Sequence, residues 1–227
     1  MESKMIEFAR PDGKKAPGYL AVPADGKHHG GVVVVQEWWG LNPQIKSVAD
    51  KLAQAGFRAL VPDLFRGKIS KDRDEASHRM QNLDWGDASS QDLRGGVQHL
   101  KSWDPTKVAV LGFCMGGALT IIAGAKIPEV DAGVCFYGIP PAQAADPSAL
   151  RVPMQFHFGT QDEWCSPPVV QKLETTLKQA KRPYELYSYD AQHAFMNDAR
   201  PEVYDPKASA LAWQRALEFL RRELKQS

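Results

Sequence analysis

A cysteine between two glycines is the residue of this sequence best placed to do chemistry. Cys114 follows the apolar run 108–111 and precedes a segment of small residues, in a Gly-x-Cys-x-Gly pattern at 112–116. This strand-turn-helix pattern is a nucleophile elbow, with cysteine where serine usually stands. Glycine is needed at Gly112 and Gly116, where a Cβ would collide with a neighbouring strand or helix. The positive end of the following helix favours a thiolate, so the motif predicts a nucleophile rather than an ordinary buried cysteine.

Two residues further along the chain are candidates for the base and for the group that orients it. Asp162 lies just beyond a predicted strand, and His193 lies just beyond the last predicted strand. The order of Cys114, the aspartate and the histidine is the order of a hydrolase triad, although each alone is also typical of a polar surface loop. His157 and Asp190 are rival candidates. His157 lies inside its strand, and Asp190 would have to fold back to orient His193.

Composition and charge exclude several classes of function. The chain has 227 residues, of which 43 % are hydrophobic and 24 % charged, enough for a sizeable core. A formal net charge of +1, with no basic or acidic block, gives no support for nucleic-acid or membrane-surface binding. The segment 1–7 lacks the apolar core of a signal peptide, and no apolar run is long enough to cross a bilayer. Three cysteines without metal-type spacing predict reduced thiols in a cytoplasmic protein.

Predicted strands alternate with predicted helices from residue 31 onward, which indicates an α/β fold with a mostly parallel sheet and helices on both faces. The carboxyl ends of parallel strands meet at one edge, where active sites collect. No linker or repeat divides the chain, so we expect a single domain over 1–227. Strands are predicted at 4–9, 18–22, 31–36, 57–61, 107–111, 132–137, 152–158 and 184–189, helices at 42–55, 86–103, 169–180 and 207–224, and a polar excursion at 66–84.

Five motifs together resemble the dienelactone hydrolase, or carboxymethylenebutenolidase, family of the α/β-hydrolase superfamily. The resemblance covers nearly the whole chain and implies a monomeric α/β-hydrolase domain. It also implies a small-molecule ester or lactone substrate and no metal or organic cofactor. The motifs are Gln-Glu-Trp-Trp-Gly-Leu-Asn at 36–42, Pro-Asp-Leu at 62–64, Gly-Phe-Cys-Met-Gly-Gly at 112–117, Gly-Thr-Gln-Asp at 159–162 and His-Ala-Phe at 193–195.

The resemblance assigns a role to each candidate catalytic residue. It implies that Cys114 is the nucleophile, His193 the base and Asp162 its orienter. A fourth residue, Glu37, contacts the resting thiol in the family and helps to activate it when substrate binds. A carboxylate that takes the thiol proton only when needed leaves a resting thiol that resists oxidation. The other interpretation of Glu37 is a surface glutamate at the end of a strand.

Backbone groups and aromatic side chains complete the expected site. In this architecture the oxyanion hole uses two backbone N–H groups, here those of Met115 and Trp38. Aromatic side chains near the motifs are candidates for apolar walls of a substrate pocket, or alternatively for the core. These candidates are Trp38, Trp39, Phe113, Tyr137 and Trp164.

The sequence departs from the family where the substrate carboxylate is bound. Members that hydrolyse dienelactone hold that carboxylate with arginines, one of them in a His-Ser-Phe-Ala-Arg pattern. Here Ala194 replaces the serine and Asn197 replaces the arginine, while Arg200 is three residues out of register. Arg73 is the nearest match to a second arginine, and Arg79 is its rival. Both arginines are also consistent with solvated helix charges.

The leading hypothesis is a cysteine hydrolase that cleaves a lactone or activated ester through a thioester. A thiolate is itself a good leaving group, so substrates that release enolates or phenolates are favoured over amides or simple alkyl esters. One alternative is a broad carboxylesterase with no role in dienelactone hydrolysis. Another is a hydrolase-fold protein whose thiol is a redox sensor or a relic, against which Glu37, Asp162 and His193 argue.

Overall fold

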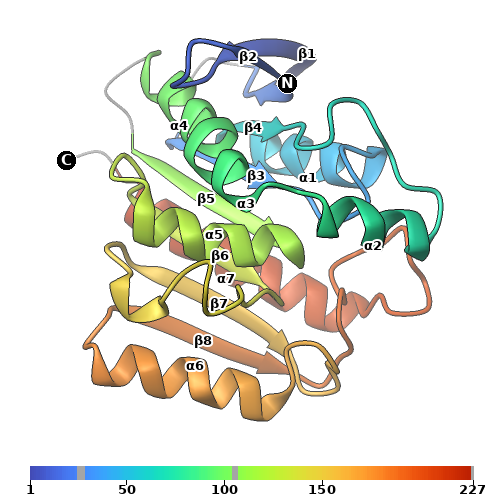
Figure 1. Cartoon of the computed structure of the whole chain (residues 1–227), viewed down its shortest axis with the longest axis vertical. Helices are drawn as coiled ribbons and strands as arrows, with labels where there is room; N and C mark the ends of the chain where they lie inside the picture. Colours follow the sequence, from blue (N-terminus) through green and yellow to red (C-terminus); the bar gives the residue numbers. More distant parts are fainter. Residues whose placement is uncertain (25–28, 104–106, 226–227) are drawn as a thin grey trace.

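A computed structural model describes residues 1–227 except 25–28, 104–106 and 226–227 (Figure 1). Within these residues, eight strands form one sheet in the order β1-β2-β4-β3-β5-β6-β7-β8. The β1/β2 and β2/β4 pairs are antiparallel, and all other pairs are parallel. The strands are β1 (Glu2–Ala9), β2 (Lys15–Val22), β3 (Gly31–Val35), β4 (Arg58–Pro62), β5 (Val108–Phe113), β6 (Ala132–Phe136), β7 (Met154–Gly159) and β8 (Tyr184–Tyr189).

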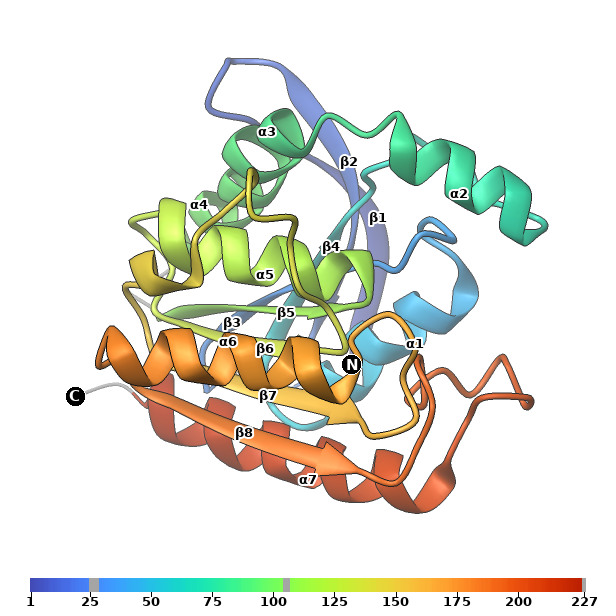
Figure 2. The same cartoon turned by 60° about the horizontal axis from the view of Figure 1, so that its bottom comes forward.

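Helices cover both faces of the sheet (Figures 1 and 2). One core cluster contains buried side chains of α4, α5 and α6, and the other contains those of α1 and α7. The sheet is therefore the middle layer of three, as the alternation of elements predicted. The helices are α1 (Pro43–Gln54), α2 (Arg73–Gln81), α3 (Trp85–Asp87), α4 (Arg94–Lys101), α5 (Met115–Lys126), α6 (Pro167–Gln179) and α7 (Pro206–Glu223), with a π-helix η1 (Ala88–Leu93) and a 3-10 turn η2 (Pro147–Ala149).

The central strands are apolar on both faces because helices cover both faces. Every residue of β3 and of β5 is buried. Along β3 the side chains alternate: Val33 and Val35 join the core under α4 and α5, whereas Val32 and Val34 join the core under α1 and α7. This packing fixes the carboxyl ends of the central strands. The candidate catalytic residues follow the carboxyl ends of β3, β5, β7 and β8.

The single helix expected over 86–103 is divided into α3, the π-helix η1 and α4. The wider π turn contains Asp92, whose carboxylate is buried. It pairs with Arg10 at 3.1 Å and with Arg66 at 2.8 Å. The π turn thus carries an ion pair that links the β1 hairpin to the segment after β4, a tertiary contact that helical periodicity does not reveal.

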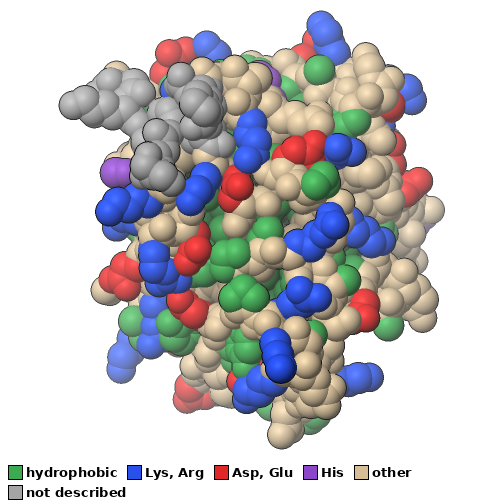
Figure 3. Space-filling model, turned by 90° about the vertical axis from the view of Figure 1, so that its left-hand side faces the viewer, with side chains coloured by type: hydrophobic (Ala, Val, Ile, Leu, Met, Phe, Trp, Pro, Cys, Tyr) green, Lys and Arg blue, Asp and Glu red, His purple; other side chains and the backbone are tan. Residues whose placement is uncertain are grey.

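The face at the amino ends of the parallel strands is opposite the candidate site (Figure 3). On the part of it formed by described residues, Lys and Arg side chains are interspersed with Asp and Glu and with small apolar areas. This mixture agrees with the near-neutral formal charge of +1. None of the helices in the described ranges is both long and apolar enough to cross a membrane.

Adding a methyl group at Gly116 is expected to destabilise the fold, because a Cβ there would lie 2.3 Å from the backbone oxygen of Val35. Gly116→Ala should cost about 2–3 kcal/mol, as overpacking against rigid backbone does. Gly96→Ala is the matched control, since its Cβ would meet only side chains, at 3.4 Å or more. It should be neutral or stabilise α4 by up to about 1 kcal/mol. Urea unfolding measures the stability of both variants, and equal unfolding midpoints would contradict the clash expected at Gly116.

Candidate active site

Cys114 occupies the turn between β5 and α5 in a strained conformation, with φ 53° and ψ −117°. Its N–H donates to Phe136 O at 3.0 Å, and its own carbonyl accepts the Ala118 N–H at 3.1 Å. A Cβ on Gly112 would lie 2.1 Å from Gly116 O, which confirms the collision expected there. Non-glycine residues rarely adopt a positive φ unless the surrounding structure imposes it, and such residues cluster at functional sites.

Asp162 and His193 are joined by a hydrogen bond of 2.7 Å between Asp162 Oδ2 and His193 Nδ1. The other carboxylate oxygen of Asp162 accepts the backbone N–H groups of Trp164 at 2.7 Å and Cys165 at 2.9 Å. The carboxylate is buried and held on both oxygens, so it fixes the orientation of the imidazole. The second imidazole nitrogen is left for Cys114, with which His193 also interacts.

The surroundings of His193 favour its protonated form. Burial alone would lower its pKa, but the hydrogen bond to Asp162 and the interaction with Cys114 outweigh this effect and raise the pKa to about 10. The ring of Tyr137 meets the imidazole edge-on at 5.1 Å, and Trp164 lies nearly parallel to it at 6.0 Å. An imidazolium held beside a cysteine sulfur is the arrangement that stabilises a thiolate.

Glu37 lies at the end of β3 and is buried. Its Oε1 accepts the Tyr137 hydroxyl at 3.1 Å, and its Oε2 accepts the Asn197 side-chain amide at 2.7 Å. Burial raises the pKa of Glu37, and the hydrogen bonds and the cations His193 and Arg200 oppose this only in part. Tyr137 itself has a φ of 40°. Glu37 and Cys114 line the same cavity, and a carboxylate of raised pKa is suited to accept a proton.

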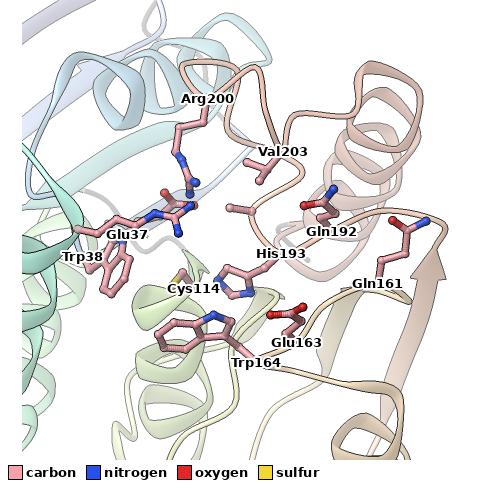
Figure 4. A pocket seen from close by; sticks show the side chains of 12 residues that line it. Glu37, Trp38, Cys114, Gln161, Glu163, Trp164, Gln192, His193, Arg200 and Val203 are labelled. Atoms are coloured by element: carbon pink, nitrogen blue, oxygen red, sulfur yellow. The ribbon is translucent and has the colours of Figure 1, made fainter.

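These residues meet at a cavity of about 500 Å³ (Figure 4). Cys114 and His193 lie together at its base, Trp164 flanks them, and Arg200 reaches toward them from the opposite side. Trp38 contacts both Trp39 and Trp164 edge-on, each at 5.6 Å. The lining residues are Glu37, Trp38, Arg73, Cys114, Gln161, Glu163, Trp164, Gln192, His193, Ala194, Arg200 and Val203.

Of the residues expected at the oxyanion hole and the substrate pocket, Trp38, Trp164 and Arg73 line the cavity. Met115 begins α5, where backbone N–H groups have no partner within the helix. The other expected binding residues do not line the cavity. They are Trp39, Phe113 and Tyr137, which pack beside it or in the core, Asn197, which binds Glu37, and Arg79, which pairs with Glu75 and Ser70.

The rival residues have other partners. His157 is fully buried in β7 between Tyr189 and Gln155, and burial lowers its pKa to about 3. Asp190 accepts the side-chain amide of Gln161 at 2.7 Å. The sequence motifs did not single out Gln161 or Gln192 as lining residues, although each is the immediate neighbour of a candidate catalytic residue.

A metal centre is not evident in the described part of the chain, where no three His, Cys, Asp or Glu side chains are grouped as metal ligands would be. The groups that the cavity does present are a thiol, an imidazole and carboxylates. Cys114 and His193 line the cavity, and Asp162 is hydrogen-bonded to His193 behind it. This is the arrangement that a nucleophile, a base and its orienter require.

Comparison with known proteins agrees with this geometry. A model of the dienelactone hydrolase family matches residues 16–224. This chain belongs to the dienelactone hydrolase family. A relative in Aquifex aeolicus, named "Putative carboxymethylenebutenolidase", is 35% identical over 98% of this chain and 99% of its own. "Protein usf" of Aquifex pyrophilus is 33% identical over 97% of this chain and 99% of its own.

The fold is also that of solved members of the family. A protein from metagenomic libraries described as a dienelactone hydrolase-like promiscuous phosphotriesterase superposes with a TM-score of 0.86. It is 21% identical and covers 98% of each chain. The α/β-hydrolase fold expected from the sequence is thereby confirmed, and family membership supports an esterase-type hydrolase.

Removing the Asp162 carboxylate should lower the pKa of His193, because their hydrogen bond raises it. NMR titration of the imidazole should show wild-type His193 still protonated at pH 8 and the Asp162→Asn imidazole neutral there. Because the folded pKa exceeds the usual value of 6.5, this interaction stabilises the fold fully below pH 6.5, and its contribution is lost as pH rises toward 10. Asp190→Asn is the matched control. An unchanged titration in Asp162→Asn would contradict the assigned partner.

Proposed function

We propose that this protein is a cysteine hydrolase that cleaves a lactone or an activated carboxylic ester through a thioester intermediate. The observation that carries the proposal is the connected set Cys114, His193 and Asp162, of which Cys114 and His193 line an open cavity. Family membership supports the same class of reaction. A non-catalytic thiol sensor would have no use for a buried carboxylate that orients a histidine toward the sulfur.

The reaction follows from the positions of these groups. The Cys114 thiolate attacks the carbonyl carbon, and the backbone N–H groups of Met115 and Trp38 stabilise the oxyanion. The C–O bond then breaks, and His193 gives its proton to the leaving oxygen. Neutral His193 next takes a proton from water, the resulting hydroxide attacks the thioester, and the carboxylic acid and the thiolate are released.

Glu37 fits the activating role that the family resemblance implies. Its carboxyl group is buried at the cavity wall, and burial raises its pKa toward that of a thiol. A carboxylate of raised pKa is a stronger base, which makes proton transfer to it less unfavourable. The Tyr137 and Asn197 hydrogen bonds hold both carboxylate oxygens, so we propose that they position Glu37 for this step.

Two cations make a substrate with its own carboxylate the preferred class. Arg73 of α2 and Arg200 both line the cavity that contains Cys114. Asn197, which stands where the family has an arginine, is used to hold Glu37. We propose that Arg200 takes the place of the missing arginine and binds the substrate carboxylate together with Arg73.

A broad carboxylesterase is the second candidate. The edge-on Trp38 and Trp164 pair beside Cys114 favours it, because aromatic walls bind neutral acyl groups as well. Trp164 is 61% exposed, which leaves this side of the cavity open to substrates of different shapes. The two candidates share the mechanism and differ only in the selectivity for anionic substrates.

Replacing the sulfur tests the reaction itself. Cys114→Ala should abolish hydrolysis of cis- and trans-dienelactone and of p-nitrophenyl acetate while the protein remains folded, because no other thiol and no hydroxyl side chain lines the cavity among the described residues. The control is Cys135→Ala, which removes a fully buried thiol of β6 and should retain turnover. Turnover by Cys114→Ala at the wild-type rate would refute the proposal that Cys114 is the nucleophile.

The arginine assignment predicts a change in selectivity. Arg200→Gln should raise KM for dienelactone about tenfold or more, since a charged hydrogen bond is worth roughly 1.5–3 kcal/mol. The rate with neutral p-nitrophenyl acetate should change little. Arg79→Gln is the matched control, because Arg79 lies outside the cavity and pairs with Glu75. Equal effects on both substrates, or an equal effect of Arg79→Gln, would favour the broad esterase.

A further inference from the structure

The guanidinium of Arg200 already holds a carboxylate of the protein. Its Nε and Nη2 both lie near Glu202 Oε1, at 2.9 Å and 2.8 Å. This edge of the guanidinium, with two parallel N–H groups, is the one that binds carboxylates most strongly. The guanidinium also lies over the ring of Trp39, 5.5 Å from its centre, which restricts its orientation.

The side chain of Glu202 is held beside Arg200 by charge rather than by burial. Its side chain is 56% exposed, whereas that of Arg200 is only 18% exposed. A backbone hydrogen bond of its own, the ion pair with Arg200 and the more distant charge of Arg73 lower the pKa of Glu202. Both cations that act on Glu202 line the cavity. The Glu202 carboxylate thus binds the Arg200 guanidinium, the group that is suited to bind a substrate carboxylate.

Another glutamate offers a comparison within the same cavity. Glu163 lines the cavity but forms no ion pair within the described part of the chain. It carries the same charge as Glu202 and differs in having no contact with Arg200. A comparison of variants at Glu202 and Glu163 therefore distinguishes direct competition for Arg200 from a general effect of negative charge at the cavity.

We propose that Glu202 is a built-in competitor for the anion subsite: it occupies Arg200 in the free protein and is displaced by the carboxylate of an anionic substrate. This inference rests on the proposed function. Glu202 is only two residues from Arg200, so its carboxylate is always close to the guanidinium, whatever the substrate concentration. A substrate carboxylate therefore displaces Glu202 only when the rest of the substrate gains further contacts in the cavity. Neutral esters have no charge to place on Arg200 and are unaffected, so Glu202 sets the selectivity between the two classes.

Alkylation of Cys114 tests this proposal without requiring turnover. The thiolate attacks the methylene carbon of iodoacetate or of iodoacetamide and iodide leaves, so the two reagents differ in the carboxylate that Arg200 would attract. The ratio of the two rate constants should rise about threefold to fivefold in Glu202→Gln, the size that an exposed ion pair supports. It should stay near the wild-type value in the matched control, Glu163→Gln.

A double-mutant cycle establishes whether Glu202 acts through Arg200. Arg200→Gln should lower the ratio, and adding Glu202→Gln to it should then have no further effect. An unchanged ratio in Glu202→Gln would overturn the proposal. So would an equal rise in Glu163→Gln, or a Glu202→Gln effect that persists without Arg200, since each would show a general field rather than competition.

A binding measurement keeps this inference separate from the proposed reaction. Glutarate, a dicarboxylate that cannot react, should quench tryptophan fluorescence at a several-fold lower concentration in Glu202→Gln than in wild type or Glu163→Gln. Failure of both reagents to alkylate Cys114 would refute the proposed nucleophile, while the glutarate titration would still decide the role of Glu202. Equal glutarate affinities in all three proteins would refute the proposal that Glu202 competes with anions for Arg200.

Discussion

The position of one sulfur atom depends on how closely backbone segments approach one another around it. A Cβ on Gly116 would lie 2.3 Å from Val35 O, and one on Gly138 would lie 2.3 Å from Cys114 O. The end of β3, the start of α5 and the segment after β6 therefore meet with no side chain between them. This contact holds Cys114 at a φ of 53°, a strain of about 1–3 kcal/mol that the packed sheet around it offsets.

The same close contact brings charges together where little water can screen them. Asp162 is fully buried behind His193, and Glu37 is buried on the other side of Tyr137. Each carboxylate is hydrogen-bonded on both oxygens, so each is held in one orientation. Buried charges are tolerated only when they are paired in this way.

The sequence alone was sufficient to find the candidate catalytic side chains that lie at the ends of sheet strands. Cys114, Asp162 and His193 each follow a strand, and short apolar or β-branched runs bounded by turn residues are recognisable as strands without tertiary information. It could not choose between Arg73 and Arg79, because both lie on α2 and only the docking of that helix decides which one reaches the cavity. Nor could it show that Asn197 would bind Glu37.

The segment that follows β8 carries several side chains of the candidate site. It contains His193, Asn197 and Arg200, so the proposed base, a hydrogen-bond partner of Glu37 and a cavity cation share one short stretch of chain. Its anchor is Phe195, which is fully buried, packs on Tyr137 at 5.4 Å and accepts the Asp205 N–H at 3.1 Å through its carbonyl. A substitution that loosened this anchor would displace His193 and Arg200 together. We therefore expect the proposed selectivity to change through exposed side chains of the segment, which alter the charge at the cavity and leave the anchor in place.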